Sequence, residues 1–265
     1  APNLQQMPIR SEFGSELRKI FIPEQGEYWL SADYSQQEPR ILTHFAILNK
    51  NKGAEDVQEA FIKGLDFHRQ TADMAGIPRR LAKTIGLGVM YGMGYKKLAV
   101  DLDISPVEAK EMLKEFRTKV PFMQGMLEDV MNRANKVGTI RTYLGRKCRF
   151  DLYEPSWYDP GVFHKALPLK QAQAEYGGQV KRAGTYKALN RLIQGTAADQ
   201  TKKAMVDVYE NLGIIPLIQV HDELNCSVKS DKQAKDIKDI MENSMKLEVP
   251  SKVDFKTKDN WGDAK

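Results

Sequence analysis

The sequence predicts an α+β fold in which both ends of the chain form a strand-bearing body and the middle forms a helical insert. Strand-like apolar runs lie near both ends, at 28–32 and 214–228. Helix start and stop signals concentrate between residues 79 and 138, and a strong helical segment at 186–212 leads back to the second group of strands. With 265 residues, 42% of them hydrophobic and 28% charged, the chain is long enough to bury a full core and has the composition of a globular protein.

The first half of the chain contains three clear elements. Residues 28–32 are typical of a short strand that delivers Asp33 at its C-terminal edge. A helix is predicted over 79–90. A second one is predicted over 106–119, because Ser105 is a good N-cap, proline follows it at the first helical position and a glutamate stands at the capping-box position.

The second half alternates between regular and irregular segments. A helix that follows residue 120 should end at Gly138, since glycine is the commonest residue just past a helix C-terminus. Residues 151–184 are rich in Gly, Pro and aromatic residues with poor periodicity, so we expect a long irregular connection there. The other expected elements are a strand at 139–144, a helix at 186–212 closed by Gly213, a helix capped by Ser230 that runs to about 247, and a strand at 253–257.

Composition and charge exclude several classes of protein. No apolar run approaches the length of a membrane span, and the N-terminus lacks the features of a signal peptide. The two cysteines, Cys148 and Cys226, have no metal-ligand spacing and suggest no disulfide framework, which favours a reducing, cytosol-like compartment. The net charge of +5 and the pI near 9.0 permit a polyanionic partner without requiring one.

His221, Asp222 and Glu223 stand between two apolar, strand-like runs, 214–220 and 224–228. No glycine or Asn-Gly turn signal separates the runs, so the three polar residues are predicted at a tight hairpin bend. A carboxylate there is fixed by backbone on both sides, which suits a metal ligand. Taken alone, the segment is more typical of a solvated hairpin tip.

Asp33 provides the second chemical signal because it ends an apolar strand and precedes a predicted helix. On this segment alone, a helix N-cap is an equally good interpretation. Together, Asp33 and Asp222 supply two carboxylates from opposite ends of the chain. Such aspartates can hold two Mg²⁺ ions about 3.5–4 Å apart for in-line phosphoryl transfer.

The predicted helix at 79–90 carries Arg79, Lys83 and Leu87 at four-residue steps, and Tyr91 continues the series. Two cations and a ring on one face can hold a triphosphate and then contact a sugar and a base. The alternative is that Arg79 and Lys83 form a solvated basic face, while Leu87 and Tyr91 belong to the core.

Two glycines interrupt the same predicted helix. Gly86 and Gly88 should each lower the stability of the helix by about 1 kcal/mol relative to alanine. We therefore expect a substrate or a template base to approach the helix closely at this point. A dinucleotide-binding loop does not fit, because no strand precedes the glycines and their spacing is not GxGxxG.

Several motifs follow one another along the chain: PNLQQMPIR at 2–10, DYSQQEPR at 33–40, DFHR at 66–69, RRLAK at 79–83 followed by YG at 91–92, the segment 190–199 and HDE at 221–223. This ordered set of motifs resembles family A (DNA polymerase I-like) DNA polymerases. Each motif is weak alone, but the set covers nearly the whole chain and is very specific. The resemblance implies a palm at 1–44 and 181–265, made of an antiparallel sheet with flanking helices, and a mostly helical fingers insertion at 45–180. Thumb and proofreading exonuclease domains, which precede the first motif in this family, are expected to lie outside this chain.

The resemblance implies roles for the acidic residues. Asp33 and Asp222 would bind two catalytic magnesium ions, for which Mn²⁺ can substitute, with the backbone carbonyl of Tyr34 as a further ligand. Glu223 would lie beside these ligands, and His221 would lie near the primer terminus.

It also implies a site for the incoming nucleotide. Arg79, Lys83 and His68 would hold the triphosphate, and Lys83 would donate a proton to the departing pyrophosphate. Glu38, packed against Tyr91, would crowd the 2′ position of the sugar and reject ribonucleotides. Gln36 and Leu87 complete the implied site. The family usually has an aromatic residue in place of Leu87, so we expect an altered nucleotide preference here.

DNA contacts follow from the same resemblance. Arg10, Asn190 and Gln194 would read the minor groove of the primer-template, and Tyr186 stands where the family commonly has an arginine that adds a further contact. A second group of basic residues would contact DNA phosphates. For this group, a generic basic surface is an equally good interpretation. This group comprises Lys136, Arg141, Arg146, Lys147 and Arg149.

The leading functional hypothesis is template-directed DNA synthesis, in replication or repair, from dNTPs on primer-template DNA. The expected setting is the cytoplasm of a bacterium or a phage-infected host, with an organellar source left open. No membrane partner is expected, whereas other domains or subunits of a larger polymerase are. Two alternatives stay open: a single-subunit RNA polymerase core, and a thumbless DNA-binding fragment with little activity alone.

Overall fold

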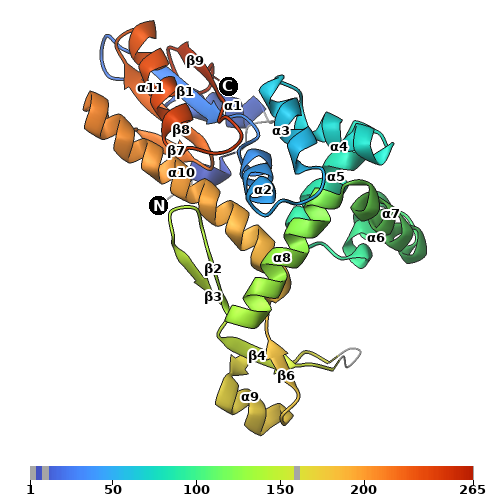
Figure 1. Cartoon of the computed structure of the whole chain (residues 1–265). Helices are drawn as coiled ribbons and strands as arrows, with labels where there is room; N and C mark the ends of the chain where they lie inside the picture. The colour runs from blue at the N-terminus through green and yellow to red at the C-terminus, as the bar shows by residue number, and fades with distance from the viewer. Residues whose placement is uncertain (1–3, 8–11, 158–161, 265) are drawn as a thin grey trace. The chain divides into compact units, whose positions relative to one another are not determined.

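A computed structural model describes residues 4–7, 12–157 and 162–264 (Figure 1). The chain divides into two compact units, and each is described by itself. Unit 1 combines Ala1–Ile41 with Ala197–Lys265, and unit 2 is Leu42–Thr196. The two divisions fall inside helices α2 (Gln37–Leu48) and α10 (Ala188–Leu212). The assignment of palm and fingers, with divisions after residues 44 and 180, stays a prediction.

Unit 1 is built on a four-stranded antiparallel sheet with the strand order β7-β8-β1-β9. The strands are β1 (Tyr28–Tyr34), β7 (Ile218–Val220), β8 (Glu223–Val228) and β9 (Val253–Lys258). Strand β1 is central and pairs with β8 on one side and with β9 on the other. The two ends of the sequence therefore meet in one sheet, as the sequence predicts.

The two faces of this sheet differ in chemistry because side chains alternate along each strand. One face is apolar: Leu30, Ala32 and Leu224 pack with buried residues of α10 and of α11 (Asp231–Asn243). The opposite face carries Ser31 and Glu223, beside a smaller apolar cluster. The apolar face anchors the sheet, and the other face is left to carry polar groups.

The remaining elements of unit 1 are η1 (Leu4–Gln6) and α1 (Glu12–Lys19). Ser230 caps α11 as predicted, by accepting a hydrogen bond from the backbone N–H of Gln233. Helix α11 ends at Asn243, however, rather than near residue 247. Strand β7 is also shorter than predicted, because regular pairing covers only the last three residues of the run 214–220.

Helices dominate the first part of unit 2, and three sequence predictions are confirmed there. Helix α5 (Arg79–Met90) has the expected bounds. Helix α7 (Pro106–Lys119) begins with a complete capping box between Ser105 and Glu108. Helix α8 (Pro121–Val137) ends at Gly138, which adopts a left-handed conformation. The other helices are α3 (Ala54–Ile62), α4 (Phe67–Ala75) and α6 (Tyr95–Leu102).

The second part of unit 2 corrects two predictions. The segment 151–184 is not irregular: it forms a three-stranded antiparallel sheet with one helix, drawn in yellow in Figure 1. The predicted strand at 139–144 is instead the start of a short hairpin, β2 (Thr139–Arg141) and β3 (Lys147–Arg149). The elements of the insert are β4 (Leu152–Pro155), β5 (Leu167–Pro168), α9 (Leu169–Tyr176) and β6 (Val180–Arg182), and η2 (Thr185–Lys187) follows them.

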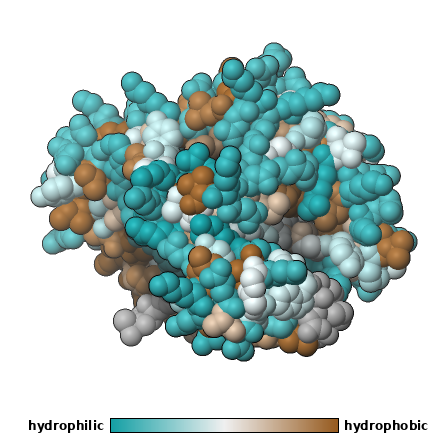
Figure 2. Space-filling model, turned by 60° about the horizontal axis from the view of Figure 1, so that its bottom comes forward, coloured by the Kyte–Doolittle hydropathy of each residue, from teal (hydrophilic) through white to brown (hydrophobic). Residues whose placement is uncertain are grey.

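Hydrophilic side chains predominate on the face drawn in Figure 2, and hydrophobic ones occur in small scattered groups. Such scattering is ordinary for a globular protein. Among the described residues, none of the helices combines the length and the hydropathy needed to cross a bilayer.

Candidate active site

Asp33 and Asp222 lie on neighbouring parts of the unit 1 sheet. Asp33 is the sixth residue of β1, and its register partner on β8 is Glu223. The backbone N–H of Tyr34 donates a hydrogen bond of 3.2 Å to the carbonyl oxygen of Asp222. Both aspartates are half-buried. Backbone pairing thus places two aspartates that are far apart in the sequence next to each other, and their role as a pair of metal ligands stays a prediction.

The turn that carries Asp222 is a two-residue hairpin between Val220 and Glu223, which are register partners. It uses no glycine. His221 adopts a positive φ of 53°, a conformation in which histidine is several-fold enriched over other non-glycine residues. Its carbonyl oxygen accepts a hydrogen bond of 2.5 Å from Nε2 of Gln219, and its side chain is exposed.

Glu223 is buried, with a relative exposure of 2%. Its Oε1 accepts two hydrogen bonds, one of 2.6 Å from the Ser31 hydroxyl and one of 3.2 Å from Nε1 of Trp261. The guanidinium of Arg18 lies 4.1 Å above the Trp261 ring, and the charge of Glu223 acts to raise the pKa of Arg18 against the larger effect of burial. Glu223 is therefore fixed beside Asp33 by groups of its own unit.

The segment after Asp33 is held rigidly. The side chain of Tyr34 points into the apolar core, where its hydroxyl donates 2.7 Å to the carbonyl of Met241, so only its backbone is available to a ligand. Gln36 has a positive φ of 53° at the bend into α2. Arg40 is buried and donates to the carbonyls of Ser35 (2.9 Å) and Pro250 (2.6 Å). These bonds fix the direction in which α2 leaves the strand.

One carboxylate beside Asp33 was not predicted from the sequence. Asp254 on β9 is the register partner of Asp33 on the side opposite to Glu223. Asp33 and Asp254, with Ser31, line a cavity of about 170 Å³. The alternation of residues 253–257 predicts the strand, but no local signal predicts which strand it joins or in which register.

The residues of this site fit a magnesium ion that takes part of its ligand set from a substrate. Within the described ranges, no group of three or more His, Cys, Asp or Glu side chains is placed to hold a metal ion. Asp33 and Asp222 nevertheless offer the hard oxygen donors that Mg²⁺ prefers. Protein-bound Mg²⁺ is commonly held by one or two carboxylates, with substrate phosphates and waters as the remaining ligands.

Helix α5 of unit 2 presents the predicted basic face. Arg79 and Lys83 are exposed, Leu87 is half-buried, and Tyr91, just after the helix, is 41% exposed. Residues between them, such as Ile85, are buried and attach the helix to the unit. The interpretation in which Leu87 and Tyr91 are wholly core residues is therefore not supported.

Arg79 is held by the neighbouring helix α4. Its Nε and Nη2 donate to the two carboxylate oxygens of Asp66, at 2.8 and 2.9 Å. Asp66 also caps α4 by accepting a hydrogen bond from the backbone N–H of Arg69. The bond with Arg79 lowers the pKa of Asp66 and raises the pKa of Arg79.

His68 lies on the first turn of α4 and is 7% exposed. Burial is the main cause that lowers its pKa. Lys83 and Arg79 lower that pKa further, while Asp66 raises it. The buried Nδ1 of His68 has no hydrogen-bond partner among the described residues. The predicted triphosphate group of Arg79, Lys83 and His68 therefore lies together in unit 2, with His68 neutral near pH 7.

Of the two glycines of α5, Gly88 has an internal cause, which corrects the expectation of a close substrate there, whereas nothing in the structure explains Gly86. A Cβ on Gly88 would lie 2.0 Å from Cε of Met93, and one on Gly86 would meet Phe116 at an ordinary 3.7 Å. Both glycines are buried. The side chain of Met93 therefore occupies the space beside Gly88 that was expected to receive a substrate or template base, and the expectation for Gly86 stays a prediction.

The predicted DNA-contacting residues are divided between described and undescribed parts of the chain. Asn190 and Gln194 lie on α10, half-buried and exposed respectively. Nη2 of Arg146 donates to the carbonyl of Gly195 on the same helix, and Lys147 is exposed at the start of β3. Arg10 lies outside the described residues. Glu38 lies in unit 1 and Tyr91 in unit 2, so their packing stays a prediction.

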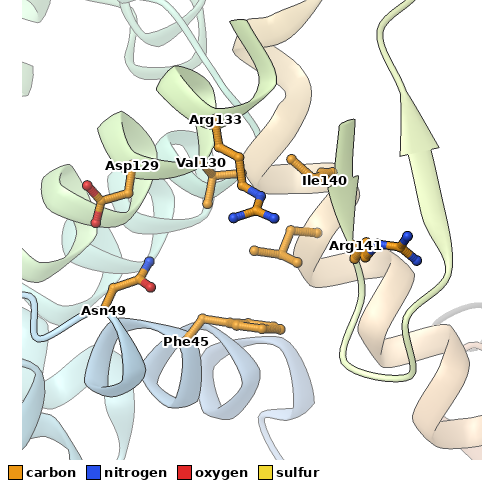
Figure 3. A pocket seen from close by; sticks show the side chains of 8 residues that line it. Phe45, Asn49, Asp129, Val130, Arg133, Ile140 and Arg141 are labelled. Atoms are coloured by element: carbon orange, nitrogen blue, oxygen red, sulfur yellow. The ribbon is translucent and has the colours of Figure 1, made fainter. Parts of the chain in front are cut away.

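A separate pocket of about 490 Å³ opens in unit 2 between α2, α8 and β2 (Figure 3). Phe45 lies along one side, and the guanidinium of Arg133 reaches into the space, while that of Arg141 points away from it. Among the described members of the predicted DNA-contacting set, Arg141 alone lines this pocket. The other lining residues are Asn49, Asp129, Val130, Ile140 and Leu192.

Comparison with known proteins extends these observations. The chain is 36% identical, over 98% of its length, to the DNA-directed DNA polymerase of Pseudomonas phage M6. It is 36% identical to DNA polymerase I of Deinococcus radiodurans and 32% identical to the thermostable DNA polymerase I of Thermus aquaticus, over its full length in both cases. It covers 42%, 26% and 30% of these three proteins, respectively, and so spans less than half the length of each.

A solved structure is also similar. It is the POL domain of Pol1 from M. smegmatis in complex with DNA primer-template and dNTP, which matches 99% of this chain with 31% identity and a TM-score of 0.79. The chain covers 45% of that protein. This likeness confirms the predicted α+β polymerase fold. A family model for DNA polymerase family A matches residues 1–263, and the chain therefore belongs to DNA polymerase family A.

Proposed function

We propose that this chain carries the nucleotide-adding centre of a DNA polymerase, which extends a primer 3′ end on a DNA template by using dNTPs. The observation that carries the proposal is the pairing of Asp33 with the Asp222 turn on adjacent strands, fixed by the Tyr34 N–H bond to the Asp222 carbonyl. Its relatives are bacterial and phage polymerases, which supports a reaction in the cytoplasm of a bacterium or an infected host, in replication or repair.

The carboxylates of Asp33 and Asp222, with the backbone carbonyl of Tyr34, would hold two Mg²⁺ ions, for which Mn²⁺ can substitute. When bound, these ions would neutralise charge on the phosphoryl oxygens and lower the pKa of the attacking hydroxyl. Glu223 is held beside the two aspartates by its bonds to Ser31 and Trp261. His221 would contribute its exposed ring near the primer terminus.

The basic face of α5 would bind the incoming nucleotide. Arg79 and Lys83 supply two cations, and neutral His68 offers a hydrogen bond to a phosphate oxygen. Lys83 would also donate a proton to the departing pyrophosphate. Leu87, Tyr91 and Gln36 would contact the sugar and base, and Glu38 would exclude a 2′-hydroxyl. Such clamps supply most of what phosphoryl transfer requires.

Primer-template DNA would contact the exposed side of α10 and the β2–β3 hairpin. Asn190 and Gln194 would face minor-groove acceptors that all base pairs share, so they would report shape rather than sequence. Arg146 and Lys147 would contact phosphates, as would Arg10.

The deciding experiment is primer extension with Mg²⁺ by the wild type and by Asp222→Ala. We expect the variant to lose at least about a hundredfold in incorporation rate while it retains its affinity for duplex DNA. Asp259→Ala, which removes an exposed carboxylate of the same unit, is the matched control and should keep the wild-type rate. Equal extension by wild type and Asp222→Ala would remove the metal-site assignment.

The same assay separates the alternatives. Equal use of ribonucleotides and deoxynucleotides would favour a single-subunit RNA polymerase core and remove the role proposed for Glu38. Salt-dependent duplex binding without any incorporation by the wild type would favour a DNA-binding fragment that needs further domains.

A further inference from the structure

Arg79 is tied to a helix other than its own. The carboxylate of Asp66 accepts a forked pair of bonds from Nε and Nη2 of Arg79, at 2.8 and 2.9 Å. Asp66 is itself fixed, because its Oδ1 also accepts a bond of 2.8 Å from the backbone N–H of Arg69 at the start of α4. The position of the Arg79 guanidinium is therefore set by the N-terminus of α4.

The fork occupies one edge of the guanidinium and leaves another edge available. Arginine carries five N–H donors in a planar arrangement, which suits bidentate contact with a phosphate. Nη1 of Arg79 makes no hydrogen bond within the described residues, and 49% of the side chain is exposed. One edge is thus anchored while the other faces solvent.

The surroundings of this free edge suit an anion. Lys83 lies one helical turn further along α5, and both cations act on His68, whose buried Nδ1 lacks a partner among the described residues. Asp66 is the acidic group that is bonded to Arg79 and acts on His68. Its charge is balanced by Arg79 across the fork, so it does not cancel the attraction that Lys83 exerts on a phosphate.

We propose that Asp66 is a positioning residue for the incoming nucleotide, which holds Arg79 by its Nε–Nη2 edge and presents the remaining edge to the triphosphate. This inference rests on the proposed function. Long side chains lose rotamer freedom when they bind a ligand, and an arginine already held in its binding geometry loses less. Asp66 acts through Arg79 and does not itself contact the nucleotide.

The competing possibility is that Asp66 hinders the nucleotide, since its negative charge opposes that of a triphosphate. The two possibilities predict opposite effects when Asp66 is neutralised. Asp73 provides the comparison, because it lies on the same helix, pairs with Arg69 at 3.3 Å and makes no hydrogen bond or ion pair with a described residue of α5. Neutralising Asp73 therefore measures the effect of charge alone.

The first experiment measures KM and kcat for dATP in primer extension, and the dissociation constant of dATP, for wild type, Asp66→Asn and Asp73→Asn. Asparagine is as good an N-cap as aspartate, so Asp66→Asn keeps the cap of α4 and removes the charged fork. We expect KM and the dissociation constant to rise roughly two- to tenfold in Asp66→Asn, with little change in kcat. In Asp73→Asn both constants should stay the same or fall slightly.

A double-mutant cycle shows whether the effect passes through Arg79. Arg79→Ala should raise KM more than Asp66→Asn does, and Asp66→Asn should add nothing in the Arg79→Ala background. Arg79→Lys, which keeps the charge and loses the fork, should reproduce the Asp66→Asn effect. Thermal unfolding of each variant confirms that α4 and α5 remain folded.

The outcomes distinguish a failure of the positioning role of Asp66 from a failure of the proposed nucleotide site. A KM in Asp66→Asn that equals or falls below the Asp73→Asn value overturns the positioning role. The role is also overturned if Asp66→Asn raises KM equally in the wild-type and Arg79→Ala backgrounds. If Arg79→Ala leaves both KM and dATP binding unchanged, the proposed nucleotide site itself is wrong.

Discussion

At the scale of single residues, Glu223 is the clearest case of a carboxylate held by its own unit. Its Oε1 satisfies two buried donors, the Ser31 hydroxyl and the Trp261 indole N–H, and both of these residues are themselves buried. A buried donor that loses its acceptor pays the full desolvation penalty. Glu223 therefore contributes to stability as well as to the charge of the site.

Glu223→Ala should lower the free energy of unfolding by about 2–4 kcal/mol, because Ser31 and Trp261 would both lose their acceptor. Glu223→Gln keeps an oxygen in the same position and should cost only about 1 kcal/mol. Urea denaturation followed by circular dichroism measures both values. Equal costs for the two variants would contradict the hydrogen-bonding argument.

His68 should make stability depend on pH. Burial lowers its pKa below the ordinary value of 6.5, so at acidic pH the unfolded chain binds more protons than the folded one. Stability should therefore be lost as the pH falls through 6.5, until the folded-state pKa is passed. Chemical denaturation of wild type and His68→Gln between pH 7.5 and 5 checks this, and a similar decline in both proteins would exclude His68 as the cause.

At the scale of elements, the end of α5 depends on Gly92. This residue has a φ of 73°, and a Cβ there would lie 2.8 Å from the backbone oxygen of Tyr186, just before α10. Tyr91, a predicted nucleotide contact, immediately precedes it. The turn therefore joins α5 to the segment that leads into α10, and only glycine fits it without strain.

Gly92→Ala should lower the free energy of unfolding by about 2–3 kcal/mol, from the left-handed conformation together with the contact with Tyr186. Gly178→Ala is the matched control, because Gly178 is not among the glycines with a positive φ and a Cβ there would meet nothing within 4 Å. It should change stability by less than about 0.5 kcal/mol. Indistinguishable denaturation midpoints for the two variants would argue against a strained turn.

The sequence predicts those elements whose signals are local. The bounds of α5, the capping box at Ser105 and the end of α8 at Gly138 each follow from a few neighbouring residues. The insert at 151–184 was wrongly expected to be irregular, because its strands have only two to four residues, too few to establish an alternation. Their pairing is decided by partners elsewhere in the segment.

In the candidate site, too, some features have a local signal in the sequence and others do not. The carboxylate of Asp222 and its hairpin could be read from the sequence, because two apolar runs flank three polar residues. The positive φ of His221 and the position of Asp254 opposite Asp33 could not. The first arises from the closure of a two-residue turn, and the second from a register that only tertiary packing selects.

At the scale of the whole molecule, the effect of the net charge of +5 on DNA binding should depend on where the basic side chains lie. Lys147 and Arg149 are exposed on β3, a hairpin strand that is predicted to meet DNA phosphates, whereas Lys232 and Lys235 are exposed on α11, which is not. Each phosphate contact releases counterions and steepens the salt dependence of binding.

The double variant Lys147→Gln/Arg149→Gln should reduce the slope of log affinity against log salt by about two. The control Lys232→Gln/Lys235→Gln lowers the net charge equally, from +5 to 5 − 2 = +3, and should leave the slope unchanged. Fluorescence anisotropy with a labelled primer-template, from 50 to 300 mM salt, measures both. Equal slopes for the two variants would mean that net charge, rather than the hairpin, determines binding.

The bond between Trp261 and Glu223 also gives the protein a built-in optical reporter. The ring of Trp261 stacks with that of Trp29 at 6.3 Å, and its N–H donates to the carboxylate beside Asp33. The sequence has one other tryptophan, Trp157, which lies in the insert of unit 2. In a Trp157→Phe variant, all indole emission would come from the stacked pair, so its intensity and wavelength would follow cation binding at the carboxylates without any added label.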